Sequence, residues 1–182
     1  MEEESIDIDF TIIGLSITLC IIVLYLLPIK KLFGIDTWFT PKKLIAYSQK
    51  PRSGVEKQVF DIYSFTHITH GIIFYFLIHY IDFPDVIKEN GIWFALILEI
   101  LWEMFENSTF LINRYRMSKE FSYYNGDSIV NILGDIFMAS LGYYIGIKTD
   151  KYSLIYVLVS EVILYYYKAN LLFLSLGTLV FK

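Results

Sequence analysis

Five long apolar runs constrain the fold of this chain more than any other feature. A transmembrane helix needs about 20 predominantly apolar residues, and each run approaches or reaches that length. The runs cover residues 10–29, 62–81, 92–112, 128–147 and 152–167. The sequence therefore predicts an all-α fold, a polytopic transmembrane helix bundle of about five spans. These spans are expected to form a single integral membrane domain over residues 1–182.

Composition agrees with a multi-pass membrane location. The chain is 55% hydrophobic and 19% charged, whereas soluble domains carry roughly 45–50% apolar and about 25% charged residues. A formal net charge of −4 argues against nucleic acid as a partner, because nucleic-acid binders present basic surfaces. The single cysteine, Cys20, excludes a disulfide framework and a cysteine-based metal site. The expected partners are membrane lipids, with a homo-oligomer as a further option.

Lysine and arginine are distributed unevenly between the connections. Loop 30–61 holds seven of them, and Arg114, Arg116 and Lys119 follow the third run. The connections on the opposite side hold three lysines. The positive-inside rule therefore predicts that both basic connections are cytoplasmic and that the amino terminus is outside. The apolar tail, residues 171–181, is too short to cross the membrane alone and is expected at the interface.

The third run carries acidic residues that a membrane span should not contain. Each ionised group costs roughly 2.5–3.5 kcal/mol at the centre of a transmembrane helix. Glu99, Glu103 and Glu106 recur at i, i+4 and i+7, and Asn107 continues the same stripe. Three like charges cannot all stay ionised in a low dielectric. We expect Glu106, the nearest of the three to Arg114, to be ionised and Glu99, the deepest, to be protonated.

Polar residues also recur on one face of the second and fourth runs. They are Ser64, His67 and His70 in the second run and Asp127, Asn131 and Asp135 in the fourth. Because polar groups in lipid need protein partners, the three stripes predict that spans two, three and four meet around one polar cluster. Asp127 can alternatively cap the fourth helix. A network that only fixes helix packing is the other alternative, although such hydrogen bonds average about 0.6 kcal/mol.

These stripes supply the candidate site. The candidate catalytic residues are His67, His70, Glu103, Glu106, Asn107, Asp127, Asn131 and Asp135. His67, His70, Glu103 and Glu106 are the expected ligands of a divalent metal, and mixed nitrogen and oxygen donors suit Zn, Mn or Fe. Arg114 and Arg116 are either a basic flank that reaches lipid headgroups or a clamp for a phosphate or carboxylate.

Three classes of function fit this pattern. The favoured hypothesis is a metal- or acid/base-dependent enzyme that acts on a lipid or a lipid-linked substrate. A transporter, proton relay or small-ligand binder would use the same acids as alternately protonated sites. A membrane scaffold or assembly subunit would use them only for helix packing.

Four short blocks resemble those of a known family. They are His67-x-x-His70-Gly71, Trp102-Glu103-x-x-Glu106-Asn107-Ser108, Arg114-Tyr115-Arg116 and Gly126-Asp127-Ser128-x-x-Asn131. Their order and spacing are similar to those of a family of small bacterial integral membrane proteins of unknown function. Many members of that family begin with basic residues, which implies the opposite orientation, with the amino terminus inside. A weaker resemblance links the blocks to VanZ-like membrane proteins, which are associated with glycopeptide tolerance.

Overall fold

The computed structural model describes residues 58–117, 122 and 124–167. The predicted span 10–29, most of loop 30–61 and the tail 171–181 lie outside the described residues. The described part is helical, without strands, which confirms the predicted all-α class. Its elements are α2 (Ser64–Tyr80), α3 (Asp85–Glu89), α4 (Gly91–Glu106), α5 (Thr109–Arg116), α6 (Ile129–Thr149), the 3₁₀ turn η2 (Asp150–Tyr152) and α7 (Ser153–Tyr166).

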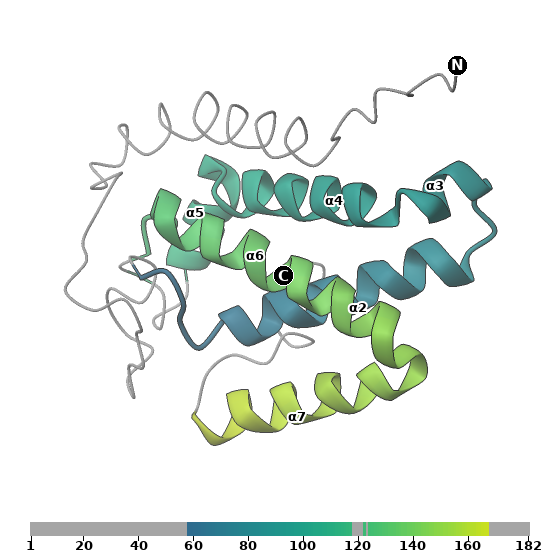
Figure 1. Cartoon of the computed structure of the whole chain (residues 1–182). Helices are drawn as coiled ribbons and strands as arrows, with labels where there is room; N and C mark the ends of the chain where they lie inside the picture. The colour runs from purple at the N-terminus through teal and green to yellow at the C-terminus, as the bar shows by residue number, and fades with distance from the viewer. Residues whose placement is uncertain (1–57, 118–121, 123, 168–182) are drawn as a thin grey trace, which may run out of the picture.

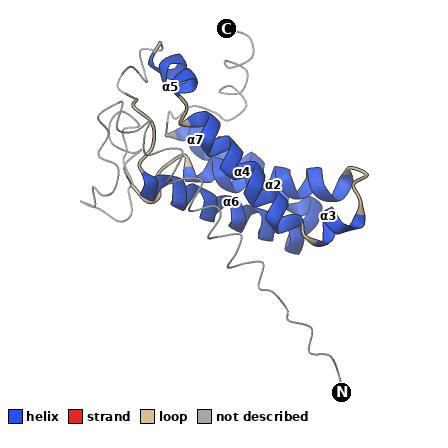
Figure 2. Cartoon of the chain, turned by 90° about the horizontal axis from the view of Figure 1, so that it is seen from above, coloured by secondary structure: helices blue, strands red, loops and turns tan. Residues whose placement is uncertain are grey.

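The four longer helices, α2, α4, α6 and α7, alternate in direction along the length of the bundle (Figure 1). α2 and α6 cross at the centre and make the most extensive contact, with α4 on one side of them and α7 on the other. The view from above in Figure 2 shows the same helices side by side, with α5 projecting at one end. The predicted runs 62–81, 128–147 and 152–167 therefore each correspond to one long helix, whereas run 92–112 covers α4 and part of α5.

Most of the described helices are shorter than a membrane-spanning helix. Within the described residues, only the continuous helical stretch Ile129–Tyr166 is both long and apolar enough to cross a membrane, which is weak evidence of membrane association. α2, α4 and α7 have 17, 16 and 14 residues, fewer than the roughly 20 residues of an untilted span. The described structure thus supports a helical bundle and does not establish five spans.

Glycine permits the close crossing of α2 and α6. A Cβ at Gly71 would overlap the main-chain carbonyl of Ala139, and a Cβ at Gly142 would overlap that of Ile68. Because these obstacles are backbone atoms, a side chain could not move them aside without separating the helices. The two glycines therefore fix the distance between α2 and α6.

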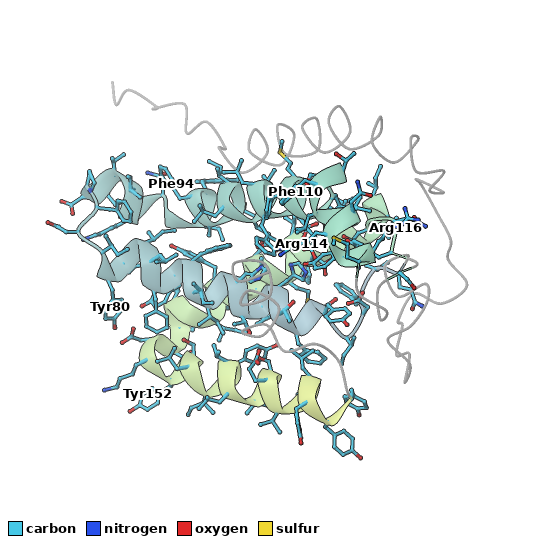
Figure 3. The ribbon with its side chains drawn as sticks, turned by 180° about the vertical axis from the view of Figure 1, so that it is seen from behind. Tyr80, Phe94, Phe110, Arg114, Arg116 and Tyr152 are labelled. Carbon is cyan, nitrogen blue, oxygen red and sulfur yellow. The ribbon has the colours of Figure 1, made fainter. Side chains whose placement is uncertain are left out.

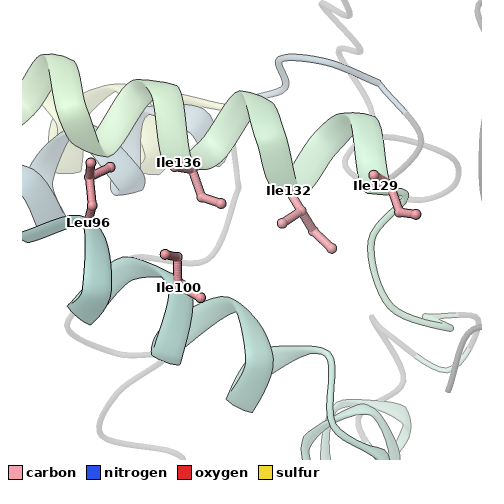
Figure 4. Packing of buried hydrophobic residues seen from close by; sticks show 5 residues of the cluster. All are labelled: Leu96, Ile100, Ile129, Ile132 and Ile136. Carbon is pink, nitrogen blue, oxygen red and sulfur yellow. The ribbon is translucent and has the colours of Figure 1, made fainter. Parts of the chain in front are cut away.

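Apolar clusters fill the space on either side of this crossing. Leu96 and Ile100 of α4 pack against Ile129, Ile132 and Ile136 of α6 (Figure 4). A second cluster joins α2 to α7 through Ile68, Ile72 and Val157. These contacts hold the polar faces of α2, α4 and α6 toward one another.

The third predicted span, 92–112, is wrong as a single continuous helix, because α4 ends at Glu106. Ser108 adopts an extended backbone, with φ −72° and ψ 153°, and its side chain accepts a hydrogen bond from the Leu111 amide at 3.3 Å. Ser108 is therefore the N-cap of a new helix, α5. The apolar pattern continues through this break, but the backbone does not.

The two ends of the bundle differ in chemistry. The start of α2, the end of α4 and the start of α6 lie together at the end that carries α5, called here the α5 end (Figure 1). Figure 3 shows Arg116 at this end and Tyr80 and Tyr152 toward the other. At that far end Asp150, with φ +47°, accepts hydrogen bonds from Tyr75 and Tyr80 and so ties α2 to the α6–α7 turn.

Candidate functional site

Five ionisable side chains from three helices meet inside the α5 end of the bundle. They are His67 and His70 of α2, Glu99 and Glu103 of α4, and Asp135 of α6, called here the His–carboxylate cluster. All five are buried, and the two glutamates are 0% and 1% exposed. Their helices bring them together because each lies on the polar stripe that its helix turns inward.

Glu99 lies at the centre of the cluster. Its Oε1 is 2.5 Å from His67 Nδ1, and its Oε2 is 3.2 Å from His70 Nδ1. One carboxylate therefore engages both imidazoles, whose ring centroids are 5.1 Å apart. The other nitrogen of the first ring, His67 Nε2, lies 3.7 Å from Asp135 Oδ2. His67 thus has a carboxylate beside each of its ring nitrogens.

Two buried polar atoms along the polar stripes have no hydrogen-bond partner among the described residues. They are Glu103 Oε1 and Asn131 Nδ2. Glu103 Oε1 lies 3.5 Å from His67 Nδ1, in the range of a weak electrostatic contact. A buried acceptor without a partner loses about 1–3 kcal/mol, so the site favours a group that supplies positive charge to this oxygen.

The cluster contains two sets of atoms spaced for metal binding. One set comprises His67, His70 and Glu99, and the other comprises His67, Glu103 and Asp135. Within each set, the candidate donor atoms lie within 4.8 Å of one another. Imidazole nitrogen with carboxylate oxygen suits Zn, Mn or Fe. Metal binding here stays a prediction, and its candidate ligands now include Glu99 and Asp135.

A second polar network adjoins the cluster and extends toward the loop before α6. Asn107 Nδ2 donates to Asp127 Oδ2 at 3.1 Å, and the Tyr124 hydroxyl donates to the same oxygen at 2.6 Å. Burial, and then the charge of Asp127, raise the pKa of Tyr124 well above its ordinary value. Tyr124 therefore stays protonated and remains a donor. Glu106 accepts from the Tyr115 hydroxyl at 3.3 Å, and burial likewise raises the pKa of Tyr115.

The expected roles of three acids change in the structure. Glu99, expected to be the deepest glutamate and protonated, contacts both histidines. Glu106, expected as a metal ligand, belongs to neither donor set that the described residues form and lies in the Tyr115 contact instead. The cap of α6 is Ser128, which accepts from the Asn131 amide at 3.2 Å, so Asp127 is free to serve the polar network.

Because the third predicted span is broken after Glu106, Arg114 and Arg116 lie on α5 and not on α4. Arg114 and Arg116 lie in the last turn of α5, and Arg116 is exposed and points away from the bundle (Figure 3). They are carried by a separate short helix rather than by the helix that bears Glu103. Binding of an anionic group by these arginines stays a prediction.

The role of Glu99 has a signal in the sequence. Adjacent antiparallel helices pair residues counted equally from their connection. Counted from the predicted ends of the second and third runs, residues 81 and 92, His70 lies opposite Glu103, and Glu99 lies one turn nearer the connection. Equal counting from the connection would therefore have placed both glutamates beside the histidines.

The geometry defines a helical protein with a buried His–carboxylate cluster. The chain belongs to the family described as protein of unknown function (DUF2585), whose model matches residues 37–181. This confirms the resemblance to a family of unknown function. No solved structure matches the chain.

Bacterial relatives called UPF0314 proteins match half of the chain. The Brucella anthropi protein is 38% identical over 92 residues, which cover 50% of this chain and 46% of the relative. The Sphingopyxis alaskensis protein is 36% identical over 91 residues, covering 48% and 46%. The chain thus spans about half the length of the relatives it matches.

Proposed function

We propose that this protein is a multi-pass membrane protein whose His–carboxylate cluster binds a divalent metal and acts on a lipid or lipid-linked substrate. The observation that carries the proposal is the distribution of polarity. Ionisable groups are gathered inside the bundle, whereas large apolar side chains cover its outside. This arrangement suits a lipid environment, in which polar groups need protein partners and apolar side chains need none.

The outward faces of α4 and α7 support the membrane part of the proposal. On α4, Ile97, Leu101 and Phe105 recur every four residues and are 50%, 54% and 45% exposed. On α7, Leu158 and Val162 are 69% and 67% exposed. Contiguous apolar stripes of this kind on a water-soluble monomer mark an interaction surface or an aggregation risk, whereas in a bilayer they are the lipid-facing surface.

The unpartnered oxygen of Glu103 supports the metal part. A cation bound by His67, Glu103 and Asp135 would satisfy this buried acceptor and balance the surplus of carboxylates over imidazoles. A bound metal can activate a water molecule or polarise a carbonyl or phosphoryl group. Residues of the cluster outside the metal's coordination sphere would then transfer protons.

The position of the cluster supports the substrate class. His70 is the seventh residue of α2, which places it about 9 Å from the start of that helix. A headgroup at the membrane interface can approach such a depth, and Arg114 and Arg116 on α5 are suited to hold its anionic groups. The weaker resemblance to VanZ-like proteins is compatible with this site and adds no substrate.

Metal analysis tests the proposal directly. The full chain is purified in detergent from cells supplied with Zn, Mn and Fe, and bound metal is measured by plasma mass spectrometry. We expect a stoichiometric divalent metal in the wild type and its loss in Glu103→Gln. The matched control is Glu89→Gln on exposed α3, which should retain the metal. A wild type that binds none of these metals, even after loading in vitro, would show that the metal assignment is wrong.

One observation favours proton transfer as a second candidate. His67 has Glu99 at one ring nitrogen and Asp135 at the other, which is the arrangement of a proton relay. Reconstituted vesicles with a pH-sensitive dye distinguish the candidates, because a relay predicts proton flux across the bilayer without added metal. An enzyme with one buried centre predicts no such flux.

A further inference from the structure

Asn107 links the His–carboxylate cluster to the loop that leads into α6. It is the C-cap of α4, and it is 1% exposed. Its amide nitrogen Nδ2 lies 3.1 Å from the Glu103 carbonyl oxygen, 3.4 Å from Glu103 Oε2 and 3.1 Å from Asp127 Oδ2. Its Oδ1 accepts from the Asp127 amide at 2.7 Å. One side chain therefore contacts both α4 and the entrance to α6.

These contacts make the two oxygens of Glu103 unequal. Oε2 accepts a hydrogen bond from Asn107, whereas Oε1 has no hydrogen-bond partner among the described residues and faces His67 at 3.5 Å. A carboxylate with one oxygen held by an amide presents the other as a single-atom ligand. Asn107 thus selects which oxygen of Glu103 is available.

The same side chain fixes the start of α6. Gly126 adopts φ +88°, a conformation that disfavours other residues. A Cβ at Gly126 would lie 3.0 Å from Asn107 Oδ1. The close approach lets the backbone present the Asp127 amide to Asn107, and α6 begins two residues later. Asp135, two turns into α6, therefore has its position set partly through Asn107.

We propose that Asn107 is a positioning residue of the metal centre. It orients Glu103 as a monodentate ligand and holds the carboxylates of α4 and α6 in register. The inference rests on the proposed function, because it requires a metal at the cluster. It goes beyond that function by assigning the geometry of the centre to a residue that does not itself contact the metal.

Cobalt binding to the full chain in detergent tests this role, because the visible absorption of Co²⁺ reports its coordination geometry. Outer-shell partners of metal ligands typically change affinity by about 10–100-fold. We expect Asn107→Ala to weaken Co²⁺ binding within that range and to change the spectrum. Asn107→Asp keeps the size and the acceptor oxygen but places a carboxylate beside Glu103 Oε2, and it should show the same spectral change.

Asn113→Ala is the matched control, because it makes the same substitution at an exposed position of α5. It should leave both the spectrum and the Co²⁺ affinity unchanged. If wild type binds Co²⁺ and both Asn107 variants keep its affinity and spectrum, the positioning role is wrong while the proposed function stands. A wild type that binds no Co²⁺ overturns the positioning role, and one that also binds no Zn, Mn or Fe overturns the proposed function as well. If Asn107→Ala does not fold, the decision rests on the Asn107→Asp spectrum.

Discussion

At the residue scale, the His–carboxylate cluster contains more carboxylates than imidazoles. Glu99, Glu103 and Asp135 surround His67 and His70 in a buried volume. Fully ionised carboxylates would exceed two imidazolium groups by one negative charge. Buried charge is tolerated only where it is paired or bound to a cation. The excess negative charge can be neutralised by protonating a carboxylate or by binding a divalent metal.

Glu99→Gln should impair metal binding, although the sequence predicts a protonated Glu99, which a neutral amide could replace. The substitution keeps the side-chain volume but replaces the carboxylate that engages both histidines. We expect affinity for Zn²⁺ to fall at least about tenfold, whether Glu99 is a direct ligand or orients the imidazoles. Competition with a coloured chelator measures it, with Glu89→Gln as control. Wild-type affinity in Glu99→Gln would restrict the centre to His67, Glu103 and Asp135.

At the element scale, the α2–α6 crossing determines whether the cluster forms. Gly71→Ala should separate these helices, because the added methyl meets the Ala139 carbonyl rather than a movable side chain. Overpacking of this kind costs typically about 1–3 kcal/mol. Thermal unfolding in detergent followed by circular dichroism should show a lower midpoint. The same variant should bind metal more weakly, because His67 moves away from Asp135.

Leu77→Ala provides the control for this prediction. Leu77 lies on α2 but is 40% exposed, so its truncation leaves the crossing untouched. Its midpoint and metal content should stay close to those of the wild type. A Gly71→Ala variant that is as stable as Leu77→Ala would show that the helices adjust freely and that the crossing does not control the cluster.

The helices were predictable from the sequence, but the break within one of them was not. Apolar runs indicate helices by their length, and the runs from residue 62 onward are all helical, although the third is divided between α4 and α5. The stop at Glu106 carries no Gly or Pro signal, and apolar residues continue through Phe110–Ile112. Local side-chain hydrogen bonds of Asn107 and Ser108, to residues four and three positions away, accompany the break. The continuous apolar run conceals this capping signal in the sequence.

The sequence indicated which helix faces turn inward at the candidate site. It did not indicate which side chains contact one another there. Helical spacing correctly indicated that His67, Glu103 and Asp135 lie on inward faces. It could not assign Glu106 to Tyr115 or Asp127 to Asn107, because those pairs depend on where α4 ends and how the loop before α6 returns. The sequence pattern does not give the rotation of each helix about its own axis or the shift of one helix along another, and these quantities determine the contacts.

At the scale of the whole molecule, the α5 end should face the cytoplasm. It carries Arg114 and Arg116, and the chain enters α2 at this end from the basic loop 30–61. Single cysteines at Asn113 and at Asp85, both exposed, mark the two ends in a Cys20→Ser background. In intact bacterial cells, an impermeant thiol reagent should label the cysteine at position 85 and spare that at 113.

Permeabilised cells provide the control for labelling, because both cysteines should then react. Labelling at position 113 but not at 85 in intact cells would reverse the orientation. The reversed result would agree with the amino-terminal charge of the resembling family and would place the substrate in the outer leaflet.

If the bundle spans a membrane as proposed above, the early end of α4 affects the thickness of the surrounding bilayer. α4 has 16 residues and α6 has 21, which correspond to about 24 Å and about 32 Å at about 1.5 Å per residue. A hydrocarbon core of about 30 Å matches α6 but exceeds α4, and lipids answer such a mismatch by thinning locally. The thinned patch would then lie beside α4, the helix that carries Glu103. Local thinning would therefore lower the lipid headgroups toward the depth of the cluster. A headgroup would then need to move a shorter distance to reach the site.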